Sequence, residues 1–300
     1  MSDVELRELR YFVAVAEELN FSRAAERLGM AQPPLSKAIA QLESRLGVPL
    51  LERTTRQVSL TPAGEVLLAE ARPVLVAARA AVQRAVRAGR IEPGLTVAVK
   101  AGGDDTLLRE ILASYGGKAE PLVTGWGGPA DRVRDGSADV ALVRSPYDEH
   151  GLDSDVLLSE ARVAALAQDH KLAAHARLRR ADLAGEPVPH WPDATPAAAA
   201  YWTGRDQASL RLEPPPRGPA VGDLAQLLAV VALGQAVAFL PESLAKAHHR
   251  AGVAYVPVTD LSPSVLAVVW PEGSRSPEIA AFVRAAAQTT QDRPELLRSS

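Results

Sequence analysis

Residues 32–37, which read Gln-Pro-Pro-Leu-Ser-Lys, combine side chains that can read DNA bases with one that can hold a phosphate. The Gln32 amide can pair with adenine, a serine hydroxyl can bond to several base edges, and a proline ring can contact a thymine methyl group. The Lys37 ammonium suits a phosphate or a guanine. The same residue types also occur on ordinary helix surfaces, so the neighbouring elements decide between the two interpretations.

Apolar residues at helical spacing predict a first amphipathic helix over residues 5–19. A second, short helix is expected over residues 23–28, with Ser22 as its N-terminal cap. Gly29 ends this helix, because glycine adopts the positive φ of a helix end at little cost. The run at residues 32–37 therefore opens a further helix directly after a tight turn.

That further helix begins at Pro33 or Pro34, where missing backbone donors cost little, and it stops at Gly47. Two helices joined by such a turn form a helix-turn-helix, whose second helix fits the major groove of DNA, although helical hairpins without this function are common. Residues 49–64 then predict a small hairpin, or wing, around a polar turn at residues 54–57. Arginines in this wing would lie beside the recognition helix and contact the phosphate backbone.

Charge along the chain is uneven. The formal net charge is −3, yet residues 21–64 carry six basic and three acidic side chains, and residues 65–90 carry five basic and two acidic ones. Because local charge governs contact with phosphates, the global balance does not argue against DNA binding.

An alanine-rich helix is expected over residues 62–88, with a local bend at Pro73. Its apolar residues alternate steps of three and four, which is typical of a helix that packs against another helix. We place the linker that follows at residues 89–94. Beyond it, short β-like runs alternate with helical ones, which indicates α/β architecture with parallel sheets.

The run over residues 21–65 resembles the DNA-binding signature of the LysR-type transcriptional regulators. Fifteen residues fall in register without a gap: Ala24, Ala25, Leu28, Gln32, Ser36, Ile39, Leu42, Glu43, Leu46, Gly47, Leu50, Arg53, Leu60, Thr61 and Gly64. Residues 159–188 and 227–246 resemble later parts of the same family more loosely. One departure is Ala31, which stands where the family usually has a Ser or Thr that would cap the recognition helix.

The resemblance implies an α+β multidomain protein: a winged helix-turn-helix DNA-binding domain over residues 1–64, a dimerising linker helix over 65–90, and an effector-binding domain over 91–300. The last domain would have two α/β lobes, like a periplasmic binding protein. The implied partners are double-stranded promoter DNA, a small-molecule effector, and further copies of the chain in a homodimer or a homotetramer built as a dimer of dimers. The candidate DNA-binding residues are Ser22, Arg23, Gln32, Pro33, Pro34, Ser36, Lys37, Arg53, Thr54 and Arg56.

In two-lobed α/β domains the ligand enters between the lobes, at the carboxyl ends of strands and the starts of helices. The turn after the first expected strand reads Ala-Gly-Gly-Asp-Asp, and its backbone donors near a helix start make a plausible anion site. Asp104 and Asp105 would repel an acidic effector if they faced inward, but as caps at a helix start they are ordinary, and we favour capping.

Three of the four tryptophans are expected near the mouth of this cleft, which hints at an apolar or aromatic effector, although tryptophan is more often part of a core. The candidate effector-binding residues are Ala101, Gly102, Gly103, Asp104, Thr124, Trp126, Trp191, Trp202 and Asp223.

Several function classes are excluded or disfavoured. The chain has no cysteine, so it holds no disulfide, thiolate zinc site or cysteine nucleophile. It has no phosphate-loop lysine motif or Gly-x-Ser-x-Gly elbow, and His248 and His249 are expected on a helix surface without a third metal ligand. No apolar run approaches about 18 residues and no secretion signal opens the chain. We therefore expect a cytoplasmic protein that is not an enzyme, with no cofactor, metal or membrane partner.

Two other hypotheses remain open. The chain is a solute-binding or catalytic α/β protein whose helical N-terminus only mediates oligomerisation, or it is a LysR-like protein that acts without an inducer. The first would contact DNA only without regard to sequence and in a salt-sensitive way. The second would show no saturable ligand in the expected cleft.

Overall fold

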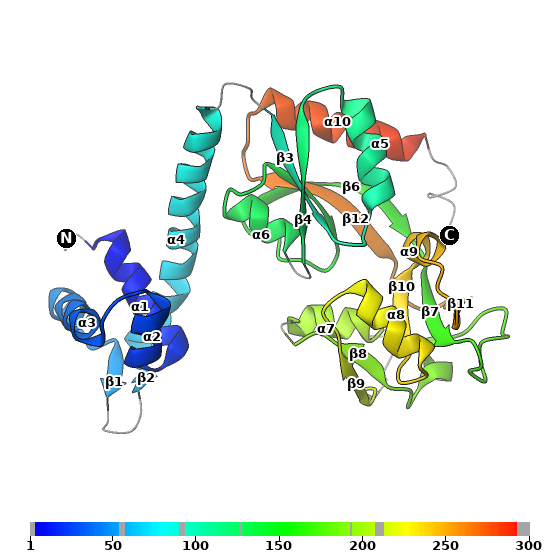
Figure 1. Cartoon of the computed structure of the whole chain (residues 1–300), viewed down its shortest axis with the longest axis horizontal. Coiled ribbons are helices and arrows are strands. Elements are labelled where there is room, and N and C mark those ends of the chain that lie inside the picture. The colour runs from blue at the N-terminus through cyan, green and yellow to red at the C-terminus, as the bar shows by residue number, and fades with distance from the viewer. Residues whose placement is uncertain are drawn as a thin grey trace. The chain divides into compact units, whose positions relative to one another are not determined.

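The computed structural model describes residues 4–53, 58–89, 94–125, 128–192, 194–207 and 213–292. The chain forms two compact units, Met1–Arg87 and Ala88–Ser300 (Figure 1). Within the described ranges, no helix has the length and apolar character needed to span a bilayer.

The first unit opens with α1 (Leu6–Glu18), α2 (Phe21–Arg27) and α3 (Gln32–Leu46), which confirms the three predicted helices. Their apolar faces share one core, in which Phe12, Leu35, Ile39 and Leu42 are fully buried. Ala24 and Ala25 are also buried there, so the small side chains of α2 let α3 approach closely. Burial of this common core holds α3 against the other two helices.

The turn between α2 and α3 has the expected conformation but a different cap. Gly29 has a φ of 66°, in the left-handed region that favours glycine. The expectation that Ser22 caps α2 is wrong, because the helix begins at Phe21 and its cap is Asn20. The Asn20 side-chain oxygen accepts hydrogen bonds from the backbone N–H groups of Ser22 and Arg23 at 2.9 and 3.0 Å.

The predicted wing is the antiparallel pair of β1 (Leu51–Arg53) and β2 (Val58–Leu60). It is tied to α3 by Glu43, whose carboxylate accepts hydrogen bonds from the backbone N–H groups of Leu50 and Leu51 at 2.9 and 3.0 Å. The predicted long helix is α4 (Pro62–Ala88), with Pro73 inside it. The Thr61 hydroxyl accepts a hydrogen bond from the N–H of Gly64 and so caps the start of α4.

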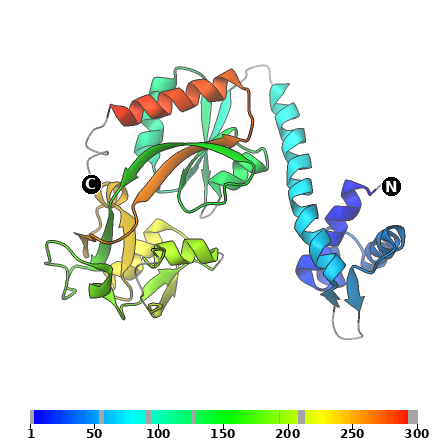
Figure 2. The same cartoon turned by 180° about the vertical axis from the view of Figure 1, so that it is seen from behind.

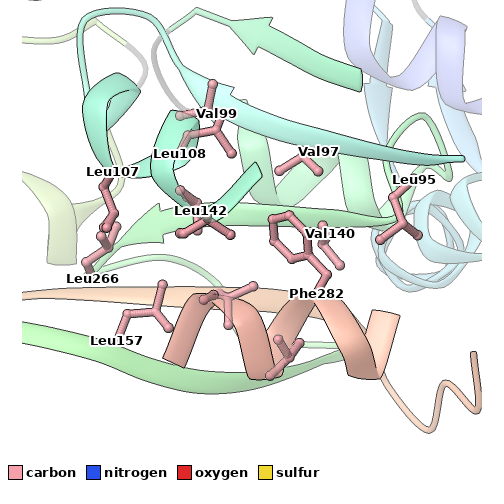
Figure 3. Packing of buried hydrophobic residues seen from close by; sticks show 14 of the residues in the cluster. Leu95, Val97, Val99, Leu107, Leu108, Val140, Leu142, Leu157, Leu266 and Phe282 are labelled. Carbon is pink, nitrogen blue, oxygen red and sulfur yellow. The ribbon is translucent and has the colours of Figure 1, made fainter. Parts of the chain in front are cut away.

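The second unit contains two lobes. The first lobe has a five-stranded sheet in the order β4-β3-β5-β12-β6. Its elements are β3 (Leu95–Lys100), α5 (Asp105–Tyr115), β4 (Ala119–Thr124), α6 (Pro129–Arg134), β5 (Val140–Arg144), β6 (Leu152–Glu160), β12 (Ser264–Pro271) and α10 (Pro277–Gln291). Val97 and Val99 point to one face of the sheet, against Ile111 of α5 and Phe282 of α10 (Figure 3). Ala98, between them, packs on the opposite face with α6.

The second lobe has a three-stranded sheet in the order β10-β7-β11 and a small pair, β8 with β9. Its elements are β7 (Arg162–Ala167), the 3-10 helix η1 (Arg180–Leu183), β8 (Val188–His190), α7 (Pro196–Trp202), β9 (Arg217–Ala220), α8 (Leu224–Ala232), β10 (Ala238–Pro241), α9 (Glu242–Ala247) and β11 (Val253–Pro257). The chain passes between the lobes twice, from β6 to β7 and from β11 to β12. Figure 2 shows β6 and β12 side by side where they leave the first sheet.

Three predictions for this unit are wrong in part. Parallel pairing holds for β3 with β4 and β5 and for β8 with β9, whereas β12 and the sheet of β7 are antiparallel. The segment 212–220, expected as a surface connection, contributes β9. The two adjacent histidines, expected on a helix, follow the end of α9, and the Tyr255 hydroxyl donates to the carbonyl oxygen of His248 at 2.7 Å.

Gly64 offers a test of how the wing packs on α4. A Cβ atom at this position would lie 2.1 Å from the Leu50 carbonyl oxygen and 3.0 Å from the Leu60 side chain. Because the nearest atom is backbone, Gly64→Ala should destabilise the first unit by about 3 kcal/mol, the upper end of ordinary overpacking. Thermal unfolding of the full chain, followed by circular dichroism, measures the loss, with the exposed neighbour Glu65→Ala as control. Equal unfolding midpoints for the two variants would contradict this packing.

Candidate nucleic-acid interface and ligand site

The start of α3 presents the predicted base-reading side chains to solvent. Gln32, Pro33, Pro34 and Lys37 are exposed and Ser36 is half-buried, whereas Leu35 between them is fully buried in the helical core. One face of the first turn of α3 therefore anchors the helix while the other face stays open. This is the arrangement that a recognition helix needs to enter a groove.

The N-terminus of α3 lacks a side-chain cap. Ala31 occupies the cap position and makes no side-chain cap hydrogen bond, as expected for an alanine there. Gln32 does not take over this role; its side-chain oxygen accepts a hydrogen bond from the Ser22 hydroxyl at 3.1 Å. Pro33 and Pro34 have no backbone N–H, so the N–H of Gln32 is the donor left in the first three positions of α3. This donor and the positive end of the helix dipole suit a DNA phosphate.

Arginines around α2 are held by the carboxylates at the end of α1. Arg23 donates to the carbonyl oxygen of Glu18 at 2.6 Å and lies 3.4 Å from its carboxylate. The Glu17 carboxylate forms ion pairs with Arg27 at 2.8 Å and with Arg72 of α4 at 2.9 Å. Burial raises the pKa of Glu17, but the hydrogen bonds from the two arginines outweigh this and hold the pKa below its ordinary value. Arg23, a predicted DNA contact, is thus also part of an ionic network that joins three helices.

Of the three wing residues predicted to contact DNA, only the backbone of Arg53 lies within the described residues. The backbone of Arg53 pairs with Val58 at the end of the hairpin. Thr54 and Arg56 lie outside the described residues.

At the boundary between the lobes of the second unit, Arg144 is the centre of a buried ionic cluster. It ends β5, and its guanidinium contacts Asp104 at 2.5 Å and Glu160 at 2.7 Å. The guanidinium also donates to the hydroxyls of Ser264 and Ser243 at 2.9 and 3.1 Å. Burial lowers the pKa of Arg144, but attraction to the two carboxylates outweighs it and raises the pKa above its ordinary value.

The cluster corrects the expected role of Asp104. Asp104 stands at the cap position of α5 but makes no side-chain cap hydrogen bond, because its carboxylate is turned to Arg144. The preceding turn also uses part of its donor set internally. Ala101 donates to the Thr124 carbonyl oxygen at 2.9 Å, and Gly103 donates to the Lys100 carbonyl oxygen at 3.1 Å. Of the two glycines expected to supply anion donors, Gly103 therefore uses its N–H within the chain.

The other predicted ligand-site residues lie on both lobes. The Thr124 hydroxyl donates to the Val99 carbonyl oxygen at 3.3 Å, next to this turn. A Cβ atom at Gly102 would lie 3.7 Å from Leu224, so the turn of the first lobe meets the start of α8 in the second. Asp223 caps α8 by accepting a hydrogen bond from the Gln226 N–H at 2.7 Å, which is a structural role.

Two of the three expected tryptophans lie together. The rings of Trp191 and Trp202 are 5.2 Å apart, and Tyr201 meets Trp202 edge to face at 5.1 Å. Trp191 is buried and belongs to the core of the second lobe, which is the structural role weighed for it. Trp202 is half-buried, and the side-chain nitrogen of Lys100 in the first lobe lies 5.8 Å from its ring centre. Trp126 lies outside the described residues.

Lys100 and Arg144 are the charged groups that the sequence reasoning missed. Each ends an apolar strand, β3 and β5, and these two strands pair in parallel. The rule that ligands meet the carboxyl ends of parallel strands would have singled out both. Within the described ranges, no three His, Asp or Glu side chains lie where they would hold a metal ion.

Comparison with known proteins gives matches over both units. Residues 6–65 match the family described as bacterial regulatory helix-turn-helix protein, lysR family, and residues 118–291 match the LysR substrate binding domain. The Hca operon transcriptional activator HcaR of Escherichia coli K12 is 30% identical over 292 residues, which cover 93% of this chain and 96% of that protein. The uncharacterized regulator YnfL of the same organism is 32% identical, over 90% of this chain and 93% of its own length.

Solved structures show the same architecture. Full-length CbnR complexed with its target DNA is 26% identical, with a TM-score of 0.58, and the match covers 95% of this chain and 100% of that chain. The oxidized form of OxyR from Corynebacterium glutamicum is 26% identical, with a TM-score of 0.53, over 99% of this chain and 95% of that chain.

Lys100 predicts a pH dependence of stability. Burial lowers its pKa to about 6; attraction to Asp104 opposes this shift and repulsion from Arg144 adds to it. The ordinary pKa of lysine is higher, so between pH 7 and 9 unfolding must take up a proton, and this group makes the fold more stable as pH rises. The contribution is at most about 1.4 kcal/mol per pH unit and is absent from Lys100→Met.

Urea unfolding at pH 7, 8 and 9 measures this slope. All four tryptophans lie after residue 88, so their fluorescence follows the second unit within the full chain. The free energy of unfolding of the wild type, minus that of Lys100→Met, should increase with pH. Lys118→Met, which removes an exposed lysine from the same lobe, is the control. A difference that is constant with pH for Lys100→Met would rule out a buried neutral amine.

Proposed function

The chain belongs to the LysR family of bacterial transcriptional regulators, and from this premise we propose how its parts divide the work. It is a DNA-binding regulator with an effector-binding domain. We assign DNA reading to residues 1–64, pairing of subunits to the linker helix over 65–90, and effector binding to residues 91–300. The first boundary falls within α4, close to its start.

DNA recognition is proposed for the exposed first turns of α3. The supporting observation is the burial pattern of residues 32–37. Leu35 is buried in the helical core, whereas Gln32, Pro33, Pro34 and Lys37 are exposed to solvent. Ser36 and Gln32 would read base edges, Lys37 would bind a phosphate or a guanine, and the backbone N–H of Gln32 would face the DNA backbone. Arg53, Thr54 and Arg56 of the wing are proposed as backbone contacts.

Ser36→Ala combined with Lys37→Ala tests this assignment. The pair should weaken binding to the duplex immediately upstream of the gene by at least ~10-fold, because it removes one base contact and one phosphate contact. The single Lys37→Ala change should weaken binding to native and shuffled duplexes alike and reduce the salt slope by about 1. Fluorescence anisotropy at two salt concentrations measures both effects.

The matched control lies on the same helix. Gln41→Ala with Ser44→Ala removes two exposed polar side chains from the second half of α3 and should leave affinity unchanged. If Ser36→Ala with Lys37→Ala bound the upstream duplex as tightly as the wild type, α3 would not be the recognition helix. Oligomeric state, measured in parallel, must stay that of the wild type.

Pairing of subunits is proposed for the second half of α4. Val82 and Val86, one helical turn apart, are 61% and 60% exposed, which is unusual for valine on a free helix surface. The small residues Ala78 and Ala85 lie beside them at the predicted seam. A second copy of α4 would bury these valines.

Val82→Glu should therefore convert the oligomer to smaller species, because the interface would have to bury a carboxylate without a partner. Light scattering coupled to size-exclusion chromatography gives the mass. Its neighbour Gln83→Glu adds the same charge on another face of α4 and should leave the mass unchanged. An unaltered mass for Val82→Glu would remove α4 from the interface.

A further inference from the structure

The guanidinium of Arg144 has all of its donors engaged by the chain itself. A guanidinium carries five N–H donors. Nε donates to Asp104 at 3.1 Å, and Nη2 donates to Asp104 at 2.5 Å and to Ser243 at 3.1 Å. Nη1 donates to Glu160 at 2.7 Å and to Ser264 at 2.9 Å. The five contacts therefore account for the whole donor set.

Asp104 binds Arg144 in the two-pronged geometry that a free carboxylate ligand would adopt. Its two oxygens accept from Nε and Nη2, which form one side of the planar fork. The pair is enclosed, with side-chain exposures of 12% for Asp104 and 10% for Arg144. A ligand carboxylate could reach this side of the fork only by replacing the Asp104 carboxylate.

The second carboxylate of the cluster is fixed for a different reason. Glu160 accepts from the backbone N–H of Ser243 at 2.6 Å and from its hydroxyl at 2.7 Å, in addition to Arg144. Glu160 ends β6, where the chain leaves the first lobe, and Ser243 lies at the start of α9 in the second. Glu160 thus joins the two lobes. Asp104 lies on a turn of the first lobe, and within the described residues the hydrogen bonds of its carboxylate go only to Arg144.

The balance of charge at the lobe boundary also opposes an anion. One arginine faces two carboxylates, and Lys100, with a pKa of about 6, adds no positive charge at neutral pH. The half-buried Trp202 ring lies at the same boundary, where the Lys100 nitrogen is 5.8 Å from its centre, and adds apolar surface.

We propose that Asp104 is a tethered internal anion that fills the carboxylate position on Arg144, so that no anionic group of an effector binds this arginine. This inference rests on the proposed binding of an effector between the lobes. Small carboxylates do not bind the wild-type protein at Arg144, and they bind once the Asp104 side chain is removed.

Chemical rescue by formate tests the proposal. Asp104→Ala leaves Arg144 with an empty side of its fork and should lower the thermal midpoint of the second unit, followed by tryptophan fluorescence in the full chain, on the order of 10 °C. Sodium formate should recover at least half of that loss in a saturable manner. Sodium chloride at equal ionic strength should not.

Three further proteins make the result specific. Asp104→Ser places a hydroxyl at the cap position of α5 and leaves room for formate, so this variant is the test if the alanine variant does not fold. Asp104→Asn fills the space with a neutral side chain and should be destabilised without rescue. Asp105→Ala removes the exposed neighbouring carboxylate and should behave like the wild type, with no shift in formate beyond that in chloride.

Two outcomes would overturn the proposal. Formate or acetate that raised the wild-type midpoint as much as that of Asp104→Ala would show that Arg144 is open to free carboxylates. A formate response no larger than the chloride response in both the alanine and the serine variants would show that no anion position exists there. Failure of the proposed DNA-binding function is read separately, as loss of preference for the upstream duplex by the wild-type protein.

Discussion

A buried guanidinium must be paired, and this requirement organises the boundary between the two lobes. Arg144 stays charged at any pH the protein meets, so leaving it without partners inside the fold would cost several kcal/mol. Asp104 and Glu160 offset that cost by forming ion pairs with two parts of the guanidinium. The first fixes the turn that opens α5, and the second fixes Ser243 at the start of α9. The pairing that neutralises this charge therefore also sets how the lobes meet.

The ionic network of the first unit contributes less to stability than the Arg144 cluster, because it is more exposed to solvent. Arg27 and Arg72 are 50% and 54% exposed where they contact Glu17, so each pair contributes about 1 kcal/mol or less. The apolar core around Phe12 and Ile39, from which water is excluded, supplies the stability of this unit. The network instead fixes directions, since Glu17 connects α1 with α2 and with the linker helix α4. Similar ion pairs thus do different physical work in the two units.

The sequence predicted local features well and distant partners poorly. Helical periodicity gave α1, α3 and α4 because each helix buries one face of a repeating pattern. The predicted parallel pairing of β12 was wrong, because the sequence of an apolar strand does not indicate whether its neighbours run parallel or antiparallel. Asp104 was assigned as a cap for the same reason: its cap position is local, whereas its partner Arg144 lies forty residues away in the chain.

The character of the ligand site depends on such distant pairings more than on residue types. Lys100 is basic in the sequence, yet burial makes it a neutral amine at neutral pH. Arg144 is basic and remains charged, yet Asp104 and Glu160 use its donors. A tally of basic residues at the carboxyl ends of β3 and β5 would therefore predict an acidic effector, although the chain's own carboxylates already occupy the donors of Arg144. Because desolvation and saturation of donors decide the effective charge of a site, the ligand class follows from the contacts that each charged group already makes.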